Sequence, residues 1–391
     1  MPSTDRPAYL ARQDARLDDL QRLVNQKTDP LCCPHAARIV SEVPVYDCHA
    51  LRERLHAEET FRRTLMGEWA GVWEEGPGII VLKGALHEHD VIDAVTHRFQ
   101  QIIGRERGQN AAGDHFAQAG ANDRVWNALE KLCLLDPALF ARYYSNDMIA
   151  LASEAWLGPN YQITSQVNNV RPGGAAQMPH RDYHLGFCTA AQAERYPAHV
   201  HRLSPLLTLQ GAVAHVDMPL ESGPTLYLPH SQKFSHGYLV AESANFRDHF
   251  DRHRVQLPLD KGDAVFFNPA LLHAAGQNRS TNIQRMANLL QVSSAFGRAM
   301  ESVDRQRMIQ TLYPELIALA RAGVLAPEAI DRVVAASAEG YAFPTNLDRD
   351  PPLGGLAPAS PQAVVLQALR ESWPAEQFEL QLDLMTQRRI S

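Results

Sequence analysis

The spacing of hydrophobic and polar residues divides the chain into three parts. Up to about residue 75 the pattern is helical. The run 76–84 (GPGIIVLKG) is short, apolar and bounded by glycines, which predicts a buried strand. Helical spacing then returns for one long segment. Its apolar residues would form a single stripe: Val95, Phe99 and Ile102 or Ile103.

From about residue 160 the pattern changes to short, partly alternating runs bounded by Gly, Pro, Asn or Asp. Short strands at regular spacing favour a sandwich or jelly-roll barrel over βαβ units. After residue 300 the spacing is helical again, and Gly323 and Gly340 are suitable helix ends. We therefore predict a mainly β protein with helical additions. Its parts would be an N-terminal helical extension (1–75), a β core (76–300) and a C-terminal helical extension packed on the core (301–391).

The composition excludes several classes of protein. With 391 residues, 45% of them hydrophobic and 21% charged, the chain resembles an ordinary globular protein. A net charge of -7 argues against binding to nucleic acid or to an anionic membrane. There is no apolar run of about 18 residues that could span a bilayer. The five cysteines are scattered and odd in number, which favours a reducing, cytoplasmic location.

The segment 178–187 (MPHRDYHLGF) carries the first candidate chemistry. In a strand, residues i and i+2 point to the same side, so His180 and Asp182 would present an imidazole and a carboxylate together. A third candidate ligand, His273, follows an apolar run in NPALLHAAGQN. Two histidines and one carboxylate form the facial triad of non-haem iron(II) oxygenases, which leaves coordination positions open.

An arginine follows on the next strand-like run. Strand alternation would place Arg285, Ala287, Leu289 and Gln291 on one face. A buried guanidinium beside a metal needs an anion, and its geometry matches a carboxylate bidentately. Arg279 is the alternative arginine for this role.

The order of these segments resembles the phytanoyl-CoA dioxygenase family. That resemblance implies a double-stranded β-helix (jelly-roll, cupin-like) core flanked by N- and C-terminal helices. It also implies Fe(II) as cofactor, 2-oxoglutarate as cosubstrate and O2 as oxidant. The matching segments are IIVLKGALHEHDVIDAV, NNVRPGG, PHRDYH, AHVDMPLESGPTLYLPHSQK and GDAVFFNPALLHAAGQN, followed by the arginine strand.

The resemblance also implies roles for individual residues. His180, Asp182 and His273 would be the iron ligands, and Arg285 would hold the distal carboxylate of 2-oxoglutarate. Asn169, Gln210 and Thr208 are the further candidates for binding the cosubstrate. The candidates for binding the substrate lie just after the HxD pair and are Tyr183, His184 and Phe187.

The chain departs from the family pattern at three places. The spacing from His273 to Arg285 is one residue longer than expected, which is why Arg279 is the alternative. A turn that usually has glycine has His230, and the histidine that follows in the family is replaced by Gln232. After the distal ligand the family often has Gly-Ser, whose hydroxyl helps to bind the cosubstrate, whereas this chain has Ala274 and Ala275. Thr208 and Gln291 are the candidates to replace that hydrogen bond.

The predicted function is hydroxylation, or another oxidation of an unactivated C–H bond, in a small organic molecule, with conversion of 2-oxoglutarate to succinate. Relatives that halogenate replace the carboxylate ligand, and here Asp182 is present. The alternatives are a catalytically degenerate β-barrel that acts in binding or assembly, and a zinc-dependent hydrolase. The helical extensions are candidates for shaping the substrate entrance or for the contact in a homodimer.

Overall fold

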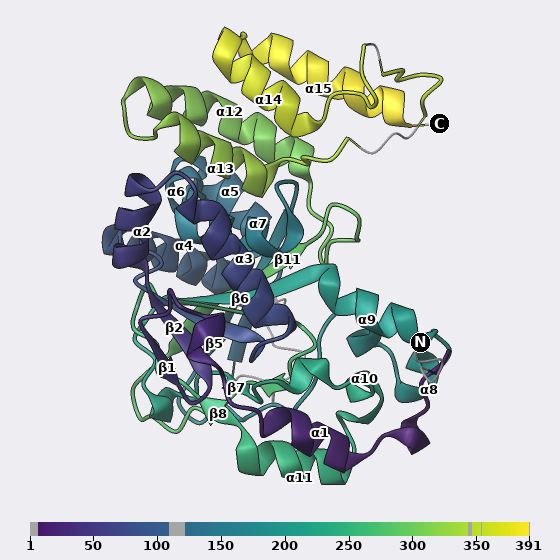
Figure 1. Ribbon diagram of the computed structural model, residues 1–391. Coiled ribbons are helices and arrows are strands. Elements are labelled where there is room, and N and C mark those ends of the chain that lie inside the picture. The colour runs from purple at the N-terminus through teal and green to yellow at the C-terminus, as the bar shows by residue number, and fades with distance from the viewer. Residues whose placement is uncertain (1–6, 109–121, 343–345, 353, 391) are drawn as a thin grey trace.

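The computed structural model describes the whole chain except residues 1–6, 109–121, 343–345, 353 and 391. The protein is built in layers (Figure 1). Helices at the C-terminus cover a second layer of helices, and this layer covers one face of a large β-sheet. A small sheet and several short helices lie on the other side of the large sheet.

The large sheet has eight strands, and all neighbouring pairs are antiparallel except β2 and β3. Its long central strands, β6, β11 and β5, pair over most of their length. The strands in spatial order are β1 (Arg38–Val40), β2 (Val43–Asp47), β3 (Ile79–Lys83), β9 (Ala264–Phe267), β6 (Thr208–Ala214), β11 (Arg285–Ser293), β5 (Gln162–Val170) and β4 (Asn122–Val125).

The small sheet has three short strands, with β7 in the middle. They are β10 (His273–Ala274), β7 (Leu226–Tyr227) and β8 (Val255–Gln256). This sheet packs on the large one through an apolar cluster that includes Val81 and Phe267 from the large sheet and Tyr227 from the small one. The two sheets therefore enclose an interior that both can line with side chains.

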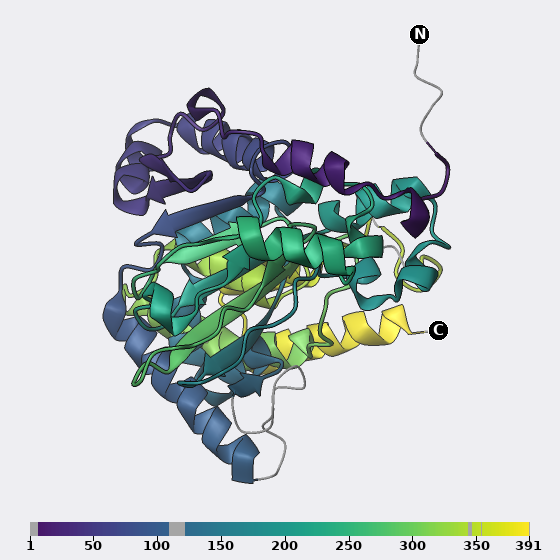
Figure 2. The same cartoon turned by 90° about the horizontal axis from the view of Figure 1, so that it is seen from below.

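Helices cover the outer face of the large sheet and both ends of the molecule. Those before β5 are α1 (Leu17–Val24), α2 (Cys48–Ala57), α3 (Phe61–Glu74), α4 (His89–Gly108), α5 (Ala128–Leu135), α6 (Pro137–Tyr144) and α7 (Asp147–Leu157). Between β5 and β9 lie α8 (Ala190–Ala193), α9 (Ala198–Leu206), α10 (Gly237–Val240) and α11 (Ala244–His253). Figure 2, seen from below, shows α11 lying across the small-sheet side.

The helical layer is attached to the sheet by large aromatic side chains. Trp69 and Trp73 on α3 are fully buried, and the indole N–H of Trp73 donates to the carbonyl of Phe266 at 3.1 Å. Trp156 on α7 donates in the same way to the carbonyl of Thr208 at 2.8 Å. Because buried polar groups must be paired, these bonds allow the indoles to pack against the backbone of the sheet. Trp69 and Trp73 thus belong to the core.

The C-terminal helices pack mainly on the helical layer. They are α12 (Arg305–Arg321), α13 (Pro327–Ser337), α14 (Pro361–Glu371) and α15 (Ala375–Arg389). Proline at the first helical position starts both α13 and α14. Arg305 ties this part to the sheet, since its guanidinium donates to the carbonyl of Ile163 in β5 at 2.8 Å. Of the described helices, none combines the length and the hydrophobicity that a membrane span requires.

Several predicted elements are present, and two expectations were too simple. The glycine-bounded run is β3, and the residues of the predicted stripe, Val95, Phe99, Ile102 and Ile103, are all buried. The expectation of a mainly β protein needs correction, because helices contribute more residues than strands and the fold is mixed. The N-terminal extension is also not purely helical, since β1 and β2 lie within it and pair with the large sheet.

Candidate metal centre and active-site cavity

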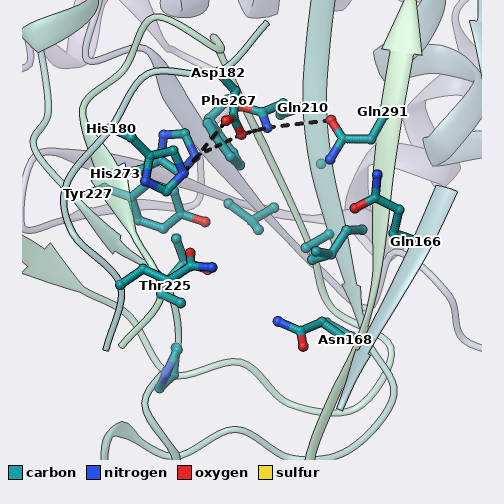
Figure 3. A pocket seen from close by; sticks show the side chains of 18 of the residues that line it. Gln166, Asn168, His180, Asp182, Gln210, Thr225, Tyr227, Phe267, His273 and Gln291 are labelled. Atoms are coloured by element: carbon teal, nitrogen blue, oxygen red, sulfur yellow. Dashed lines mark hydrogen bonds and ion pairs between the residues drawn. The ribbon is translucent and has the colours of Figure 1, made fainter. Parts of the chain in front are cut away.

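A cavity of about 560 Å³ lies between the two sheets. Residues of β3, β5, β6, β9 and β11 line it from the large sheet, and Tyr227 and His273 line it from the small sheet. Figure 3 shows polar side chains pointing into it from both sides. This size falls in the range of pockets that take drug-sized ligands.

Three predicted ligands meet at one wall of the cavity. His180, Asp182 and His273 each offer an atom, and these atoms lie within 4.8 Å of one another. Two backbone hydrogen bonds hold the histidines side by side, from His180 N to His273 O at 2.9 Å and from His273 N to His180 O at 3.1 Å. The segment after β5 and strand β10 are therefore paired at the point where both histidines occur.

The hydrogen bonds of the imidazoles determine which nitrogen can bind a metal. His180 Nδ1 lies 2.8 Å from the carbonyl of Met178, and His273 Nδ1 lies 2.8 Å from the carbonyl of Leu271. A carbonyl oxygen only accepts, so each Nδ1 must carry the proton. Each Nε2 is left with its lone pair, as metal-bound histidines require.

Asp182 lies between the two Nε2 atoms. Its oxygens are 3.7 Å from His180 Nε2 and 3.4 Å from His273 Nε2. Burial alone would raise the pKa of Asp182, but the two neighbouring histidines and the Gln210 amide outweigh it and hold the pKa well below its usual range. Burial, followed by repulsion from His273, lowers the pKa of His180. The cluster therefore presents a carboxylate beside two imidazoles.

This donor set fits a divalent metal of the iron type. Two imidazole nitrogens and one carboxylate oxygen, all on one side of a cavity, are the ligands of a facial triad. The proton positions on both Nδ1 atoms match the coordinating form of histidine. His180, Asp182 and His273 are consequently the residues that would hold the metal.

Arg285 is in the same cavity and is buried, with 7% of its surface exposed. Its guanidinium donates to the carbonyl of Gly276 at 3.2 Å, and no carboxylate is paired with it in the described part of the chain. Burial lowers the pKa of Arg285 to about 10, which still leaves it charged at neutral pH. A buried cation without an anion is costly, so the position suits an anionic ligand. The alternative, Arg279, is exposed and does not line the cavity.

A chain of side-chain hydrogen bonds extends from the metal cluster along the large sheet (Figure 3). The amide of Gln210 donates to Asp182 and, at 3.4 Å, to the Oε1 atom of Gln291. The hydroxyl of Tyr183 donates to the same oxygen of Gln291. Gln210 therefore contacts the metal cluster directly, whereas Tyr183 is buried and contacts Gln291.

The other predicted cosubstrate contacts are not at the cavity. Asn169 faces away from it and donates to Asp123 and Gln284 at 3.3 Å each. Thr208 is fully buried near the start of β6 and is not among the residues that line the cavity. Asn169 faces away from the cavity because side chains alternate along a strand, and its neighbour Asn168 points inward instead.

The segment after Asp182 makes a sharp turn that separates the predicted substrate contacts. Tyr183 and His184 both have positive φ values, 65° and 41°, in the left-handed region that few non-glycine residues adopt. As a result His184 turns away from the cavity and bonds to Ser204 at 3.2 Å. Phe187 returns to line the cavity and is 61% exposed. Of the three predicted substrate contacts, only Phe187 is in the lining.

Sequence reasoning missed several lining residues. Gln166 and Asn168 project from β5, and Gln166 accepts a hydrogen bond from Arg124 of β4 at 3.0 Å. Trp126 and Met300 complete this side. The available signal was the pairing of β5 with the arginine strand, which places Asn168 opposite Ala287, but that register is not readable from either segment alone.

Comparison with known proteins identifies the family. The model of the family described as "Phytanoyl-CoA dioxygenase (PhyH)" matches residues 75–287, which is more than half of the chain. The chain belongs to the phytanoyl-CoA dioxygenase family. It is thus an enzyme of the iron(II)- and 2-oxoglutarate-dependent dioxygenase class, and the predicted cofactors are confirmed as those of its family.

Individual relatives are more distant. "Dioxygenase trt7" of Aspergillus terreus (strain NIH 2624 / FGSC A1156) is 26% identical over 218 residues, which are 53% of this chain and 67% of the relative. Among solved structures, the epimerase SnoN from nogalamycin biosynthesis is 20% identical, with a TM-score of 0.42, covering 60% of this chain and 82% of its own. The carbocyclase SnoK from nogalamycin biosynthesis is 17% identical, with a TM-score of 0.43, covering 66% and 90%.

The turn that departs from the phytanoyl-CoA dioxygenase pattern keeps a glycine-like backbone. His230 has a φ of 68°, and histidine is one of the residues that tolerate this region best. Its Nδ1 lies 3.0 Å from Lys233 Nζ. Gln232 donates to the carbonyl of Gly76 at 2.9 Å, which ties the turn to the start of β3. The two substitutions thus preserve the turn and anchor it to the large sheet.

Glu301 supports the cavity wall from the segment before α12. It accepts a hydrogen bond from the backbone N–H of Asn127 at 2.7 Å, and its neighbour Met300 lines the cavity. Burial raises the pKa of Glu301 to about 7, although the Asn127 N–H and the Gln166 amide lower it in part. The folded chain therefore favours the neutral acid. Its stabilisation is present below the ordinary carboxyl pKa and is lost as the pH rises through about 7.

Replacing Glu301 with Gln should make stability less dependent on pH. We expect the variant to be more stable than the wild type by about 2 kcal/mol near pH 8, and to show no advantage near pH 4. Urea unfolding at several pH values measures this difference. Glu376→Gln, at an exposed position of α15, is the matched control and should change nothing. An equal effect of Glu301→Gln at both pH values would contradict the assignment.

Proposed function

We propose that this enzyme hydroxylates, or otherwise oxidises, an unactivated C–H bond of a small organic molecule and converts 2-oxoglutarate to succinate. The observation that carries the proposal is one cavity that contains a histidine–aspartate–histidine cluster together with a buried arginine that lacks an anion. The first of these fits a metal and the second fits a dicarboxylate. A zinc hydrolase would leave Arg285 without a ligand, and a degenerate barrel would not need either group.

The bound iron, 2-oxoglutarate and dioxygen would supply the oxidising power, and the chain would supply position and environment. His180, Asp182 and His273 would hold the metal from one side, leaving the side that faces the cavity open. Arg285 would bind the distal carboxylate of 2-oxoglutarate, most favourably as a bidentate pair. The apolar walls would exclude water from the reacting atoms.

The residues around the cosubstrate need one revision. The hydrogen bond that the family's serine usually gives would come from Gln291, which lines the cavity, because Thr208 does not reach it. Gln210 would orient Asp182 through its amide. Asn169 is not proposed to contact the cosubstrate, since its side chain bonds to Asp123 and Gln284.

Succinate formation tests this proposal. Purified protein with iron(II), 2-oxoglutarate and ascorbate is expected to form succinate slowly without a substrate and faster with one, and to stop when a chelator removes the metal. Product analysis should find one added oxygen atom after hydroxylation. A complete lack of succinate with a bound metal would contradict the oxygenase proposal and would favour a degenerate barrel or a zinc hydrolase.

The remaining predictions concern organisation. We propose that the two facing sheets form the double-stranded β-helix of the family, within a core of residues 76–300, and that residues 301–391 pack on it as a separate extension. A homodimer and a cytoplasmic location stay predictions from the sequence. Limited proteolysis that removes the extension, followed by measurement of turnover and of the oligomeric state, tests the role of residues 301–391 and the homodimer. If neither turnover nor the oligomeric state changes, the extension has no role in either.

A further inference from the structure

The substrate side of the cavity contains a polar group that the proposed chemistry does not use. Asn168 on β5 is 8% exposed, and its side chain points into the cavity (Figure 3). Its Oδ1 atom has no hydrogen-bond partner among the residues that the structure describes. The neighbouring amide, Gln166, is by contrast held by Arg124. A buried amide oxygen without a partner is costly, and it would accept a hydrogen bond from a hydroxyl or an N–H group of a ligand.

The charges of the cavity argue against a cationic ligand. In the described lining, the carboxylates are Asp182, which belongs to the metal cluster, and Glu242, which is exposed to solvent. The positive groups already have assigned contacts. Arg285 would face the cosubstrate, and Arg124 is bonded to Gln166. The third arginine of the lining, Arg181, donates to the carbonyl of Ser231 and lies over the ring of Tyr238. Neither an amine nor a second acid is therefore matched by a free, buried charge.

The rim of the cavity is apolar. Met178 and Phe187 line its edge, although 54% and 61% of their surfaces are exposed. Deeper in, the walls are formed by small and branched apolar residues such as Ala212, Leu257 and Val265. Large exposed apolar side chains at the edge of a pocket indicate that an apolar ligand covers them. The cavity volume of about 560 Å³ leaves room for a bulky molecule beside 2-oxoglutarate.

We propose that the substrate is a bulky, mostly apolar and uncharged molecule that donates a hydrogen bond from a hydroxyl group to the Oδ1 atom of Asn168 and packs its apolar body against Met178 and Phe187. The inference rests on the proposed function, since it assigns the part of the cavity that the metal and 2-oxoglutarate leave. Asn168 is thereby a specificity-determining residue, and the rim is the entrance of the substrate.

Calorimetry with small cage compounds tests the proposal. The probes are 1-adamantanol, amantadine and 1-adamantanecarboxylate, which share one apolar skeleton but are neutral, cationic and anionic. The iron(II)-loaded protein is titrated with each under anaerobic conditions and with 2-oxoglutarate present. 1-Adamantanol is expected to bind at least roughly fivefold more tightly than either charged probe. Equal or tighter binding of amantadine or of 1-adamantanecarboxylate would overturn the proposal.

Two variants of Asn168 assign the effect to this residue. Asn168→Ala removes the amide oxygen and should weaken 1-adamantanol binding roughly fivefold. Asn168→Asp keeps an accepting oxygen and adds a negative charge, so it should retain 1-adamantanol binding and strengthen amantadine binding. Unchanged 1-adamantanol affinity in Asn168→Ala would contradict the role of Asn168.

A separate signal reports on the proposed function itself. The visible charge-transfer absorption of 2-oxoglutarate bound to iron(II) should be the same in the wild type and in both Asn168 variants. If this absorption is absent in the wild type, the oxygenase proposal fails. If it is present while the three probes bind alike, only the substrate inference fails. Thermal unfolding of each variant shows whether it is folded.

Discussion

Replacing Asp182 with alanine is expected to abolish iron binding and succinate formation. The carboxylate lies between His180 Nε2 and His273 Nε2, and its pKa is held well below the usual range, so it is charged at every pH at which the enzyme would work. Loss of a residue that only orients a metal ligand typically costs 10- to 100-fold, so loss of the ligand itself should cost at least on the order of a hundredfold in metal affinity.

Titration of the metal-free protein with iron(II) under anaerobic conditions measures this loss, and succinate release gives the second readout. Asp251→Ala is the matched control, because Asp251 is exposed and its ion pair with Arg254 is worth little. His180→Ala and His273→Ala should behave like Asp182→Ala. Wild-type iron affinity in any of the three would show that this residue is not a ligand.

Replacing Arg285 with leucine should have the second largest effect, and it should act on the cosubstrate alone. Truncating one partner of a buried charge pair costs about 2 to 5 kcal/mol, so the KM for 2-oxoglutarate should rise on the order of a hundredfold. Iron binding should persist, since Arg285 does not belong to the ligand cluster. Arg285→Lys keeps the charge but loses the bidentate geometry, so it should retain part of the affinity.

Arg285→Leu has a second expected property that replacement of a merely structural arginine would not show. Without 2-oxoglutarate, Arg285 is a buried cation that donates, within the described part of the chain, to the carbonyl of Gly276 but pairs with no carboxylate, so its removal should leave the thermal stability unchanged or raise it. Addition of 2-oxoglutarate should stabilise the wild type but not the variant. Arg279→Leu is the matched control, because Arg279 is exposed outside the cavity. A loss of 2-oxoglutarate binding in Arg279→Leu instead would exchange the two roles.

The ligand positions could be predicted from the sequence because they depend on local chemistry. An HxD pair on an extended segment presents both side chains to one side, and a later histidine followed by an arginine completes a set with few other uses. The structure brings His180, Asp182 and His273 together and places Arg285 in the same cavity. The order of residue types along the chain was sufficient for this part.

The proportions of helix and strand were harder to predict from the sequence than the candidate ligands. Residues 38–47 form two strands that pair with the large sheet, although their surroundings have helical spacing. β1 has only three residues, and it is stabilised by pairing with β2 rather than by its own sequence. Short strands of this kind carry little periodic signal, because tertiary contacts decide whether they form.

By itself the sequence indicated the class of the enzyme, through its resemblance to the family, and it predicted the metal ligands and the arginine strand from residue type and spacing. The tertiary structure decided which residues of the neighbouring strand face the cavity. β11 pairs with β5 so that Ala287 lies opposite Asn168 and Met286 opposite Asn169, and paired residues share a face. A shift of one residue would exchange the two asparagines, and neither strand alone fixes that register. The resemblance to the family pointed to Asn169, whereas in the folded chain Asn168 is the asparagine that lines the cavity.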